Sequence, residues 1–312
     1  MLKKNNIIEL NHLLSMDTLN QSQIQSLINR ANEFANSRQT PIIKDNDIKI
    51  ITNLFFEPST RTQYAFEIAA HRLKVKTITP DIPNLSTLKG ESLIDTLVNL
   101  ETLGCSLFII RHPINHTPEF IASELHTDTR VLNAGDGTNE HPSQALTDIM
   151  TIEQHFSDFS QLKVAILGDT FHSRVARSLT TGLITMGVTN ICYITPPELI
   201  IDSSNLPEIV KQSSTEEGLH DADIIVCLRA QKERFEDPTL QINQNTYSKH
   251  YSLTQEKLAL AKPDAIVMHP GPINRGIEIE SEVADGLQSV ILQQAKNSIY
   301  IRMAILEALL SF

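Results

Sequence analysis

The chain has 312 residues, enough for one large domain or two of ordinary size. Its net charge of −11 argues against nucleic acid or an anionic membrane as a partner, and the absence of any run of about 18 apolar residues argues against a membrane span. The first residues carry a basic opening without a sustained apolar stretch and a small-residue cleavage site, so we expect no signal peptide and a cytoplasmic protein.

The cysteine pattern predicts a protein without a metal centre. Cys105, Cys192 and Cys227 are far apart and flanked by apolar residues, and they form no CxxC or Cys/His pair. We therefore expect three reduced thiols in the core. No cluster of carboxylates suggests a metal either, and we expect no cofactor.

Helical and strand-like periodicities alternate along the whole chain. In chain order we expect a helix over 16–35, a strand over 49–56, a helix beginning after Ser59, a strand over 75–79, a loop over 81–92, a helix over 92–103, a strand over 106–110, a helix fragment over 120–125, a strand over 130–133, a helix over 142–156, a strand over 163–167, a helix over 172–187, strands over 190–194, 223–228 and 265–268, and a final helix over 290–310.

This alternation predicts an α/β fold. Strands that alternate with helices form parallel sheets with right-handed crossovers. The pattern restarts at Lys163, so we expect two domains, each with a central parallel sheet flanked by helices, and a boundary near residues 140–160.

The stretch around Ser59 is the first candidate binding site. Pro58 ends a strand, Ser59 is a suitable N-cap, and the helix start that follows offers free backbone N–H groups and the positive end of the helix dipole to an anion. Thr60 and Thr62 add hydroxyls, and Arg61 adds a fixed positive charge. These residues alone are equally compatible with a well-capped structural helix. The residues expected on its buried face are Ala65, Ile68, Ala69 and Leu73.

Polar residues follow the other predicted strands as well. In open α/β sheets, ligands bind beyond the carboxyl ends of the strands. The residues found at those ends are Arg111, His141, Gln144, Arg174, Arg229, Gln231 and His269 to Pro272. One arginine alone could be a surface ion pair. With Arg61 there are four at equivalent positions in an acidic protein, which indicates a set of ligands with several negative charges.

The sequence motifs of several common enzyme classes are absent. The chain has no GxxxxGK[ST] motif, no GxGxxG fingerprint, no GxSxG motif, and no cysteine in a polar setting beside a histidine. A cationic, amide-rich site without a protein nucleophile suits direct transfer of an acyl-type group between two small anions. Catalysis would then come from orientation and from stabilisation of an oxyanion.

Seven motifs together resemble the catalytic chains of bacterial aspartate carbamoyltransferases. They are FFEPSTRT, KGES, RHP, NAGDGTNEHPSQALTD, GDTFHSRVARS, LRAQKER and HPGPINRG, in the order and spacing of that family, and the resemblance runs from about Asn6 to Leu310. It implies transfer of a carbamoyl group from carbamoyl phosphate to L-aspartate, giving N-carbamoyl-L-aspartate and phosphate, the committed step of pyrimidine biosynthesis.

The resemblance also implies an organisation. Residues 1–145 with 290–312 would form a carbamoyl phosphate-binding domain and residues 146–289 an aspartate-binding domain, joined by the helix that begins at Pro142 and by the last helix. The family further implies a homotrimer whose active sites are shared between neighbouring chains. It leaves open a larger assembly with regulatory or dihydroorotase-like chains.

The family's site residues carry over to matching positions of this chain. Those implied to be catalytic are Arg61, Thr62, Arg111, His141 and Gln144. Those implied to bind carbamoyl phosphate are Ser59, Thr60, Arg61, Thr62, Ser86, Lys89, Arg111, His141, Gln144, Pro270 and Gly271. Those implied to bind aspartate are Lys89, Arg174, Arg229 and Gln231. Lys89 would reach the next subunit's site, Thr87 is an alternative to Ser86, and the departing phosphate is the candidate proton acceptor.

The chain departs from the family pattern at three positions near the first site. Gln63 replaces an arginine, Ala65 replaces a serine, and Lys74 stands where a glycine commonly ends the helix. Two alternative functions stay open. The related ornithine carbamoyltransferases share the phosphate turn but differ in the second domain, where HPGP and LRAQKER favour aspartate. A non-catalytic binding scaffold is the other alternative, although the site positions are filled by suitable residue types.

Overall fold

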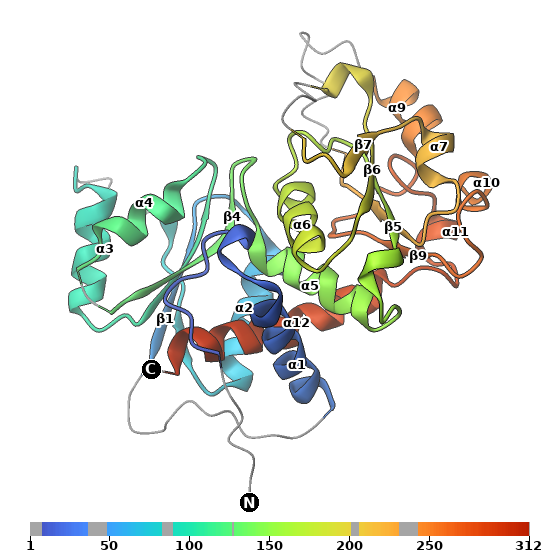
Figure 1. Ribbon diagram of the computed structural model, residues 1–312. Helices are drawn as coiled ribbons and strands as arrows, with labels where there is room; N and C mark the ends of the chain where they lie inside the picture. The colour runs from blue at the N-terminus through green and yellow to red at the C-terminus, as the bar shows by residue number, and fades with distance from the viewer. Residues whose placement is uncertain are drawn as a thin grey trace, which may run out of the picture. The chain divides into compact units, whose positions relative to one another are not determined.

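The computed structural model describes residues 8–36, 49–82, 90–126, 128–200, 206–230 and 243–311 (Figure 1). The chain divides into two compact units. Unit 1 consists of Met1–Met150 and Lys296–Phe312, and unit 2 of Thr151–Ala295. Two helices, α5 (Pro142–Glu153) and α12 (Ile291–Leu310), each have residues in both units.

Unit 1 contains a parallel sheet whose described strands lie in the order β2-β1-β3-β4. Its elements are α1 (Gln21–Asn36), β1 (Ile50–Phe55), α2 (Thr60–Arg72), β2 (Lys76–Ile78), α3 (Leu93–Thr102), β3 (Leu107–His112), α4 (Thr117–Glu124) and β4 (Arg130–Asp136), with the first part of α5 and the last part of α12. Apolar residues of α3 and α4, such as Leu97 and Ile121, pack with Leu54, Phe108 and Ile110 of the strands.

Unit 2 contains a parallel sheet whose described strands lie in the order β7-β6-β5-β8-β9. Its elements are β5 (Lys163–Leu167), α6 (Arg174–Thr185), β6 (Asn190–Ile194), β7 (Val210–Gln212), α7 (Thr215–Leu219), β8 (Ile224–Cys227), α9 (Gln244–Tyr251), α10 (Gln255–Leu258), β9 (Ile266–Met268) and α11 (Ser281–Ala284).

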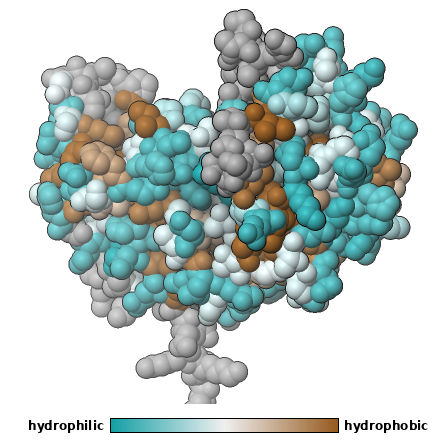
Figure 2. Space-filling view, turned by 45° about the horizontal axis from the view of Figure 1, so that its top comes forward, coloured by the Kyte–Doolittle hydropathy of each residue, from teal (hydrophilic) through white to brown (hydrophobic). Residues whose placement is uncertain are grey.

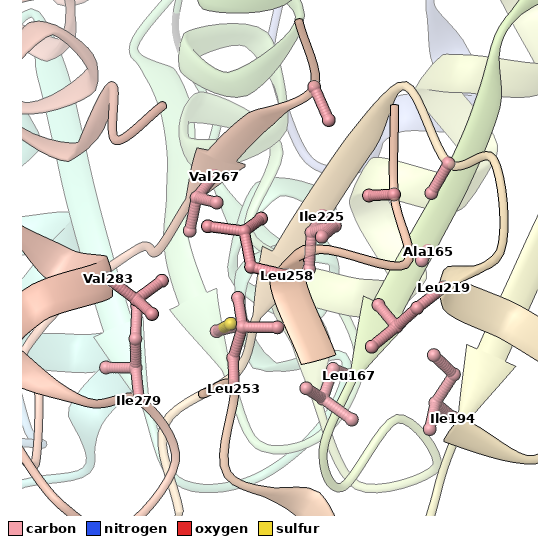
Figure 3. Close-up of a cluster of buried hydrophobic side chains, with 14 of the residues drawn as sticks. Ala165, Leu167, Ile194, Leu219, Ile225, Leu253, Leu258, Val267, Ile279 and Val283 are labelled. Carbon is pink, nitrogen blue, oxygen red and sulfur yellow. The ribbon is translucent and has the colours of Figure 1, made fainter. Parts of the chain in front are cut away.

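The core of unit 2 follows from the two-residue period of its strands. Side chains two residues apart point to the same face of a sheet. Ala165 and Leu167 of β5 therefore meet Ile225 of β8 and Val267 of β9 in one buried cluster, which Leu258 of α10 helps to cover (Figure 3). Because both faces of such a sheet are covered, its strands are continuous apolar runs, which is how they could be found in the sequence.

The structure confirms the predicted α/β class, the parallel sheets and most of the expected elements, and it corrects three details. The helix expected over 16–35 is interrupted. A short 3-10 helix, η1 (Met16–Thr18), comes first, and α1 begins at Gln21. Asn20 causes the restart, because its side chain accepts a hydrogen bond from the Gln23 N–H and its own N–H donates to the Gln23 side chain, both at 3.0 Å.

The second correction concerns the buried face of α2. Ala65, Ala69 and Leu73 are buried as expected, but Ile68 is 44% exposed and Phe66 lies in the core instead. Ile68 lies two residues from Phe66, roughly 200° around the helix, so both cannot face the core. The third correction is a set of short elements in unit 2 that the sequence analysis did not predict, namely the edge strand β7 and the helices α7, α9, α10 and α11.

The surface is largely hydrophilic on the face shown in Figure 2, with scattered hydrophobic areas. The large hydrophobic side chains that stay exposed include Tyr64, Ile68, Leu103, Leu287 and Leu292. The three cysteines are buried free thiols, as predicted. Among the described residues, no helix has the length and hydropathy that crossing a membrane requires.

Candidate active site

In the order of its described strands, each sheet has one topological switch point, where crossovers leave in opposite directions. In unit 1 it lies between β1 and β3, because β2 is on one side of β1 and β3 on the other. In unit 2 it lies between β5 and β8. Ligands of open α/β sheets bind in the crevice beyond the carboxyl ends of such strand pairs. Among the described residues that the sequence predicts, Arg61 and Arg111 lie at the first place and Arg174 and Arg229 at the second.

In unit 1 the turn after β1 leads directly into α2. Ser59 occupies the N-cap position, but its side chain makes no capping hydrogen bond and donates instead to Thr62 Oγ1 at 2.9 Å. Ser59 therefore holds the N-cap position that the sequence predicts, without capping the helix through its side chain. Thr60 and Arg61 are exposed, and Thr62 is buried in the first turn. The turn thus presents hydroxyls, a guanidinium group and the helix start together.

Arg111 lies on β3, opposite Phe55 of β1 in the sheet register. Its guanidinium group donates to the carbonyl oxygen of Ala134 on β4 at 3.2 Å and pairs with the carboxylate of Glu57 at 3.1 Å. Only 9% of Arg111 is exposed. The strand register and these two contacts therefore hold a buried positive charge beside the turn that contains Arg61.

A turn built around Asp136 connects β4 to His141. The Asp136 carboxylate is fully buried and accepts hydrogen bonds from the side chains of Asn133 and Asn139 and from the backbone N–H groups of His116 and Glu140, at 2.6 to 3.1 Å. Four donors around one buried carboxylate fix the path of the chain over residues 133–140. His141 and the start of α5 take their positions from this turn.

His141 and Gln144 lie at the start of α5. The His141 carbonyl oxygen accepts from the backbone N–H groups of Gln144 and Ala145 at 3.0 and 3.3 Å, and both site side chains are buried. The Gln144 side-chain amide donates to Asp148 at 2.8 Å. Unit 1 therefore gathers its predicted residues at the carboxyl ends of β1, β3 and β4.

His112, next to Arg111, has a structural role. Burial lowers the pKa of the His112 imidazole below its ordinary value. The neutral ring fits its contacts, because Nδ1 accepts from the Ile114 N–H at 3.1 Å and lies 3.0 Å from the Thr117 hydroxyl. His112 thus shapes the chain after β3 as a neutral acceptor.

In unit 2 the turn after β5 leads into α6, whose first residue is Arg174. Asp169 closes this turn by accepting from the backbone N–H of His172 at 3.2 Å and lying 2.7 Å from its Nδ1. The side chain of Ser173 caps α6 by accepting from the Ala176 N–H at 3.1 Å. Arg174 thereby starts a helix at the carboxyl end of β5.

Arg229 emerges beside this turn, at the end of the neighbouring strand β8. The Leu228 N–H donates to the Leu167 carbonyl oxygen at 2.8 Å and extends the pairing of β5 with β8. Gly168 permits the close approach, since a Cβ there would lie 3.0 Å from Leu228 Cβ and its φ of +129° suits glycine. Arg174 and Arg229 therefore flank one switch point, the former half-buried and the latter exposed.

The turn that contains Pro270 and Gly271 follows β9 and is held by a buried pair. His269 Nδ1 accepts from the Gly271 N–H at 2.8 Å, so in the neutral ring Nε2 carries the proton that it donates to Glu278 at 3.1 Å. Glu278 also accepts from the Ala230 N–H at 3.3 Å. One carboxylate therefore connects the turn after β9 to the residue that follows Arg229.

Four of the predicted positions fall outside the described residues, namely Ser86, its alternative Thr87, Lys89 and Gln231. Within the described part of the chain, no group of three or more His, Cys, Asp or Glu side chains could hold a metal ion.

The sequence of both units matches a known family. Residues 11–154 match the aspartate/ornithine carbamoyltransferase carbamoyl-P binding domain, and residues 160–309 match the aspartate/ornithine carbamoyltransferase Asp/Orn binding domain. The aspartate carbamoyltransferase catalytic subunit of Coxiella burnetii is 47% identical over 301 residues, which are 96% of this chain and 96% of that protein. This chain belongs to the aspartate/ornithine carbamoyltransferase family.

Solved structures of the family share the fold. Aspartate transcarbamoylase from Trypanosoma cruzi, in complex with carbamoyl phosphate, has a TM-score of 0.84 and 26% identity, covering 96% of this chain and 97% of that one. Ornithine carbamoyltransferase from Gloeobacter violaceus has a TM-score of 0.80 and 26% identity, covering 97% and 99%. Because both branches share the fold equally well, the fold does not distinguish aspartate from ornithine as the acceptor.

The structure shows the surroundings of Gln63, Ala65 and Lys74, the three residues that depart from the carbamoyltransferase pattern. The Gln63 side chain donates to Glu67 at 3.1 Å along the surface of α2, and Ala65 is buried. Lys74 adopts a φ of +61° directly after α2, the left-handed conformation that explains why glycine is common there. None of the three adds a polar group to the turn between β1 and α2.

Sequence reasoning missed the supporting residues of this carbamoyltransferase site. Asp136, Asp148, Asp169 and Glu278 are all buried carboxylates that hold site turns or side chains. In the sequence, Asp136, Asp148 and Asp169 stand inside the family motifs, whereas Glu278 follows the last motif by two residues. Since isolated carboxylates are seldom buried, an Asp inside an otherwise apolar or glycine-rich motif is the signal that could have identified the first three.

Proposed function

We propose that this chain transfers the carbamoyl group of carbamoyl phosphate to the amino group of L-aspartate, giving N-carbamoyl-L-aspartate and phosphate, the committed step of pyrimidine biosynthesis. The observation that carries the proposal is that both switch points are bordered by arginines, Arg61 and Arg111 in unit 1 and Arg174 and Arg229 in unit 2. One phosphate and two carboxylates match this distribution of charge.

The carbamoyl phosphate site is assigned to the carboxyl ends of β1, β3 and β4. The phosphate group is held by Ser59, Thr60, Arg61 and Thr62, together with the N–H groups at the start of α2. Arg111, His141 and Thr62 face the carbonyl oxygen, and Gln144 contacts the carbamoyl group. Ser86 and Lys89 complete the phosphate side.

The aspartate site is assigned to the carboxyl ends of β5 and β8. Arg174 and Arg229 each bind one carboxylate, and Gln231 and Lys89 help to place the amine. A single-carboxylate acceptor with a side-chain cation, such as ornithine, would leave one arginine without a partner and would be repelled by it.

The reaction is a direct attack through a tetrahedral intermediate. The uncharged amine of aspartate attacks the carbamoyl carbon, and the carbonyl oxygen becomes an oxyanion stabilised by Arg111, His141 and Thr62. The C–O bond to phosphate then breaks, and the proton lost by the attacking nitrogen passes to the departing phosphate. The chain contributes orientation and charge, and no protein nucleophile takes part.

With this function we propose the domain division, the location and the oligomeric state that the sequence resemblance implies. Residues 1–145 with 290–312 form the carbamoyl phosphate-binding domain and residues 146–289 the aspartate-binding domain. The chain acts in the cytoplasm as a homotrimer with shared active sites. Exposed hydrophobic residues one turn apart on α2, Tyr64 and Ile68, are consistent with association. Sedimentation equilibrium tests the trimer, which has three times the chain mass of 34.9 kDa.

The deciding experiment offers carbamoyl phosphate with L-aspartate or with L-ornithine and measures the ureido product and phosphate separately. Product with aspartate alone is expected. Product with ornithine alone would show that the arginines of unit 2 do not bind the acceptor, and binding of carbamoyl phosphate without any product would favour a scaffold.

The Arg229→Ala variant tests the assignment of the acceptor site. Loss of one charge-assisted contact to a carboxylate weakens binding by roughly 2–3 kcal/mol, about 30- to 150-fold. The KM for aspartate should therefore rise by about that factor while the KM for carbamoyl phosphate changes little. Equal weakening of both substrates would place Arg229 elsewhere.

A further inference from the structure

A buried carboxylate determines which way the side-chain amide of Gln144 faces. Gln144 and Asp148 lie one turn apart on α5, and the Gln144 Nε2 donates to Asp148 Oδ1 at 2.8 Å. Asp148 is fully buried and Gln144 is 9% exposed. An ionised carboxylate has acceptors only, so the amide nitrogen must face Asp148 and the amide oxygen must face away from it.

A buried guanidinium group, that of Arg302, interacts electrostatically with Asp148. Arg302 lies on the part of α12 that belongs to unit 1, and it is only 2% exposed. Its Nη1 donates to the Ser298 carbonyl oxygen at 3.0 Å, and its guanidinium carbon lies 4.9 Å from the centre of the Phe66 ring on α2. Burial lowers the pKa of Arg302 to about 10, and the negative charge of Asp148 opposes this shift.

The opposite charges of Arg302 and Asp148 attract each other through the protein interior. Arg302 is a cation at neutral pH, because its pKa stays well above 7. The Arg302 Nε has no hydrogen-bond partner among the described residues. The negative charge of Asp148 offsets the positive charge of Arg302 through the protein interior. The cluster also lies under the phosphate turn, since Phe66 follows Thr62 by one turn of α2 and both are buried.

The oxygen of the Gln144 amide is the group that this arrangement presents. Gln144 Oε1 accepts no hydrogen bond from any described residue, and the residue lies in the first turn of α5, after His141. A free acceptor suits the amino group of a carbamoyl ligand, which is a hydrogen-bond donor. The methyl group of acetyl phosphate has the same size and donates nothing, so it would leave the acceptor unsatisfied.

We propose that Asp148 is a positioning residue that holds the Gln144 amide with its oxygen toward the substrate and thereby selects carbamoyl phosphate over acyl phosphates that lack an amino group. The inference rests on the proposed function, because Gln144 has this role only if unit 1 binds carbamoyl phosphate. Asp148 itself does not touch the substrate. Its effect should therefore appear in substrate discrimination rather than only in overall activity.

The D148N substitution tests the inference, because the new side chain is isosteric and can donate as well as accept. The Gln144 amide can then turn over and present its NH2 group, which repels a carbamoyl amino group. We expect the KM for carbamoyl phosphate to rise about 10-fold or more while the inhibition constant of acetyl phosphate, measured as a competitor, changes little. The readout is the KM for carbamoyl phosphate divided by the inhibition constant of acetyl phosphate, and this ratio should rise about 10-fold or more.

Two further variants separate a loss of substrate discrimination from a loss of stability. D148N leaves the charge of Arg302 uncompensated, so the double variant D148N/R302M, in which the buried pair is neutral, should fold well and show the same loss of discrimination. D136N is the matched control, since it alters another buried carboxylate in unit 1 without contacting Gln144. It should lower stability and activity with the ratio unchanged.

The possible outcomes separate this inference from the proposed function. If the wild-type chain forms no carbamoyl aspartate, both are overturned. If the wild type is active and a folded D148N or D148N/R302M chain keeps the wild-type ratio, the inference alone is overturned. A ratio of KM to inhibition constant that rises in these variants and stays unchanged in D136N would establish it.

Discussion

Gly137 offers a sharp test of the turn that leads to His141. Its φ is +42°, and a Cβ at this position would overlap Oδ1 of Asn115 and lie 3.0 Å from the carbonyl oxygen of Pro113. Asn115 Oδ1 also accepts a hydrogen bond from the Thr138 N–H at 2.9 Å. Gly137→Ala therefore strains the backbone and displaces Asn115.

The size of the effect follows from these two terms. Placing alanine in the left-handed region costs about 1 kcal/mol, and losing the Asn115 hydrogen bond costs about 1 kcal/mol more. With crowding against the Pro113 carbonyl, we expect Gly137→Ala to lower the free energy of unfolding of unit 1 by about 2–4 kcal/mol. Activity should fall as well, because the same turn positions His141.

Urea unfolding of the wild type, Gly137→Ala, Asn115→Ala and the double variant measures this prediction. In the Asn115→Ala background the overlap is gone, so the glycine substitution should be about 1 kcal/mol less harmful there. The reasoning is refuted if Gly137→Ala stays within about 0.5 kcal/mol of the wild type, or if its effect is the same in both backgrounds.

Two other predictions concern ionisable side chains of unit 1. Arg30 of α1 forms a bidentate ion pair with the fully buried Glu307 of α12, at 2.5 and 2.8 Å. Arg30→Met should destabilise the fold by about 3–5 kcal/mol in urea unfolding, and Arg30→Met with Glu307→Met should recover most of that loss; no recovery would mean that packing rather than the unpaired charge causes it. His12 Nδ1 accepts from the Val131 N–H at 3.0 Å, and burial, followed by the charge of Arg130, lowers the pKa of His12 below 6.5. The unfolded chain therefore binds this proton first, so the free energy of unfolding should fall as the pH drops from about 7.5 to about 5.5. His12→Gln should make that fall smaller, and an unchanged dependence on pH would assign it to other groups.

The sequence alone determined the class of fold and most of the groups expected to contact substrate. Apolar runs such as 163–167 and 190–194 coincide with β5 and β6, because a strand covered on both faces must be apolar throughout. Polar residues directly after such runs lie at the carboxyl edge of a parallel sheet, which is why Arg111, Arg174 and Arg229 could be placed by inspection.

The details that differ from the sequence predictions depend on side-chain contacts, which the spacing of apolar residues does not reveal. The restart of the helix at Asn20 comes from a reciprocal hydrogen bond with Gln23. Phe66 rather than Ile68 is buried because of the face that α2 turns to the core, and the Ser59 hydroxyl donates to Thr62 instead of capping the helix.

Only the tertiary structure decided what holds the site residues in place. Strand order brings Arg61 and Arg111 to one switch point and Arg174 and Arg229 to another, although the members of each pair are about 50 residues apart in the chain. The same is true of the contact of Arg302 with Phe66, two residues more than 200 positions apart. A sequence records which groups can bind a substrate, because that depends on residue type near a strand end. The orientation of a group such as the Gln144 amide depends on the single low-energy packing of several elements, which exists only once the chain has folded.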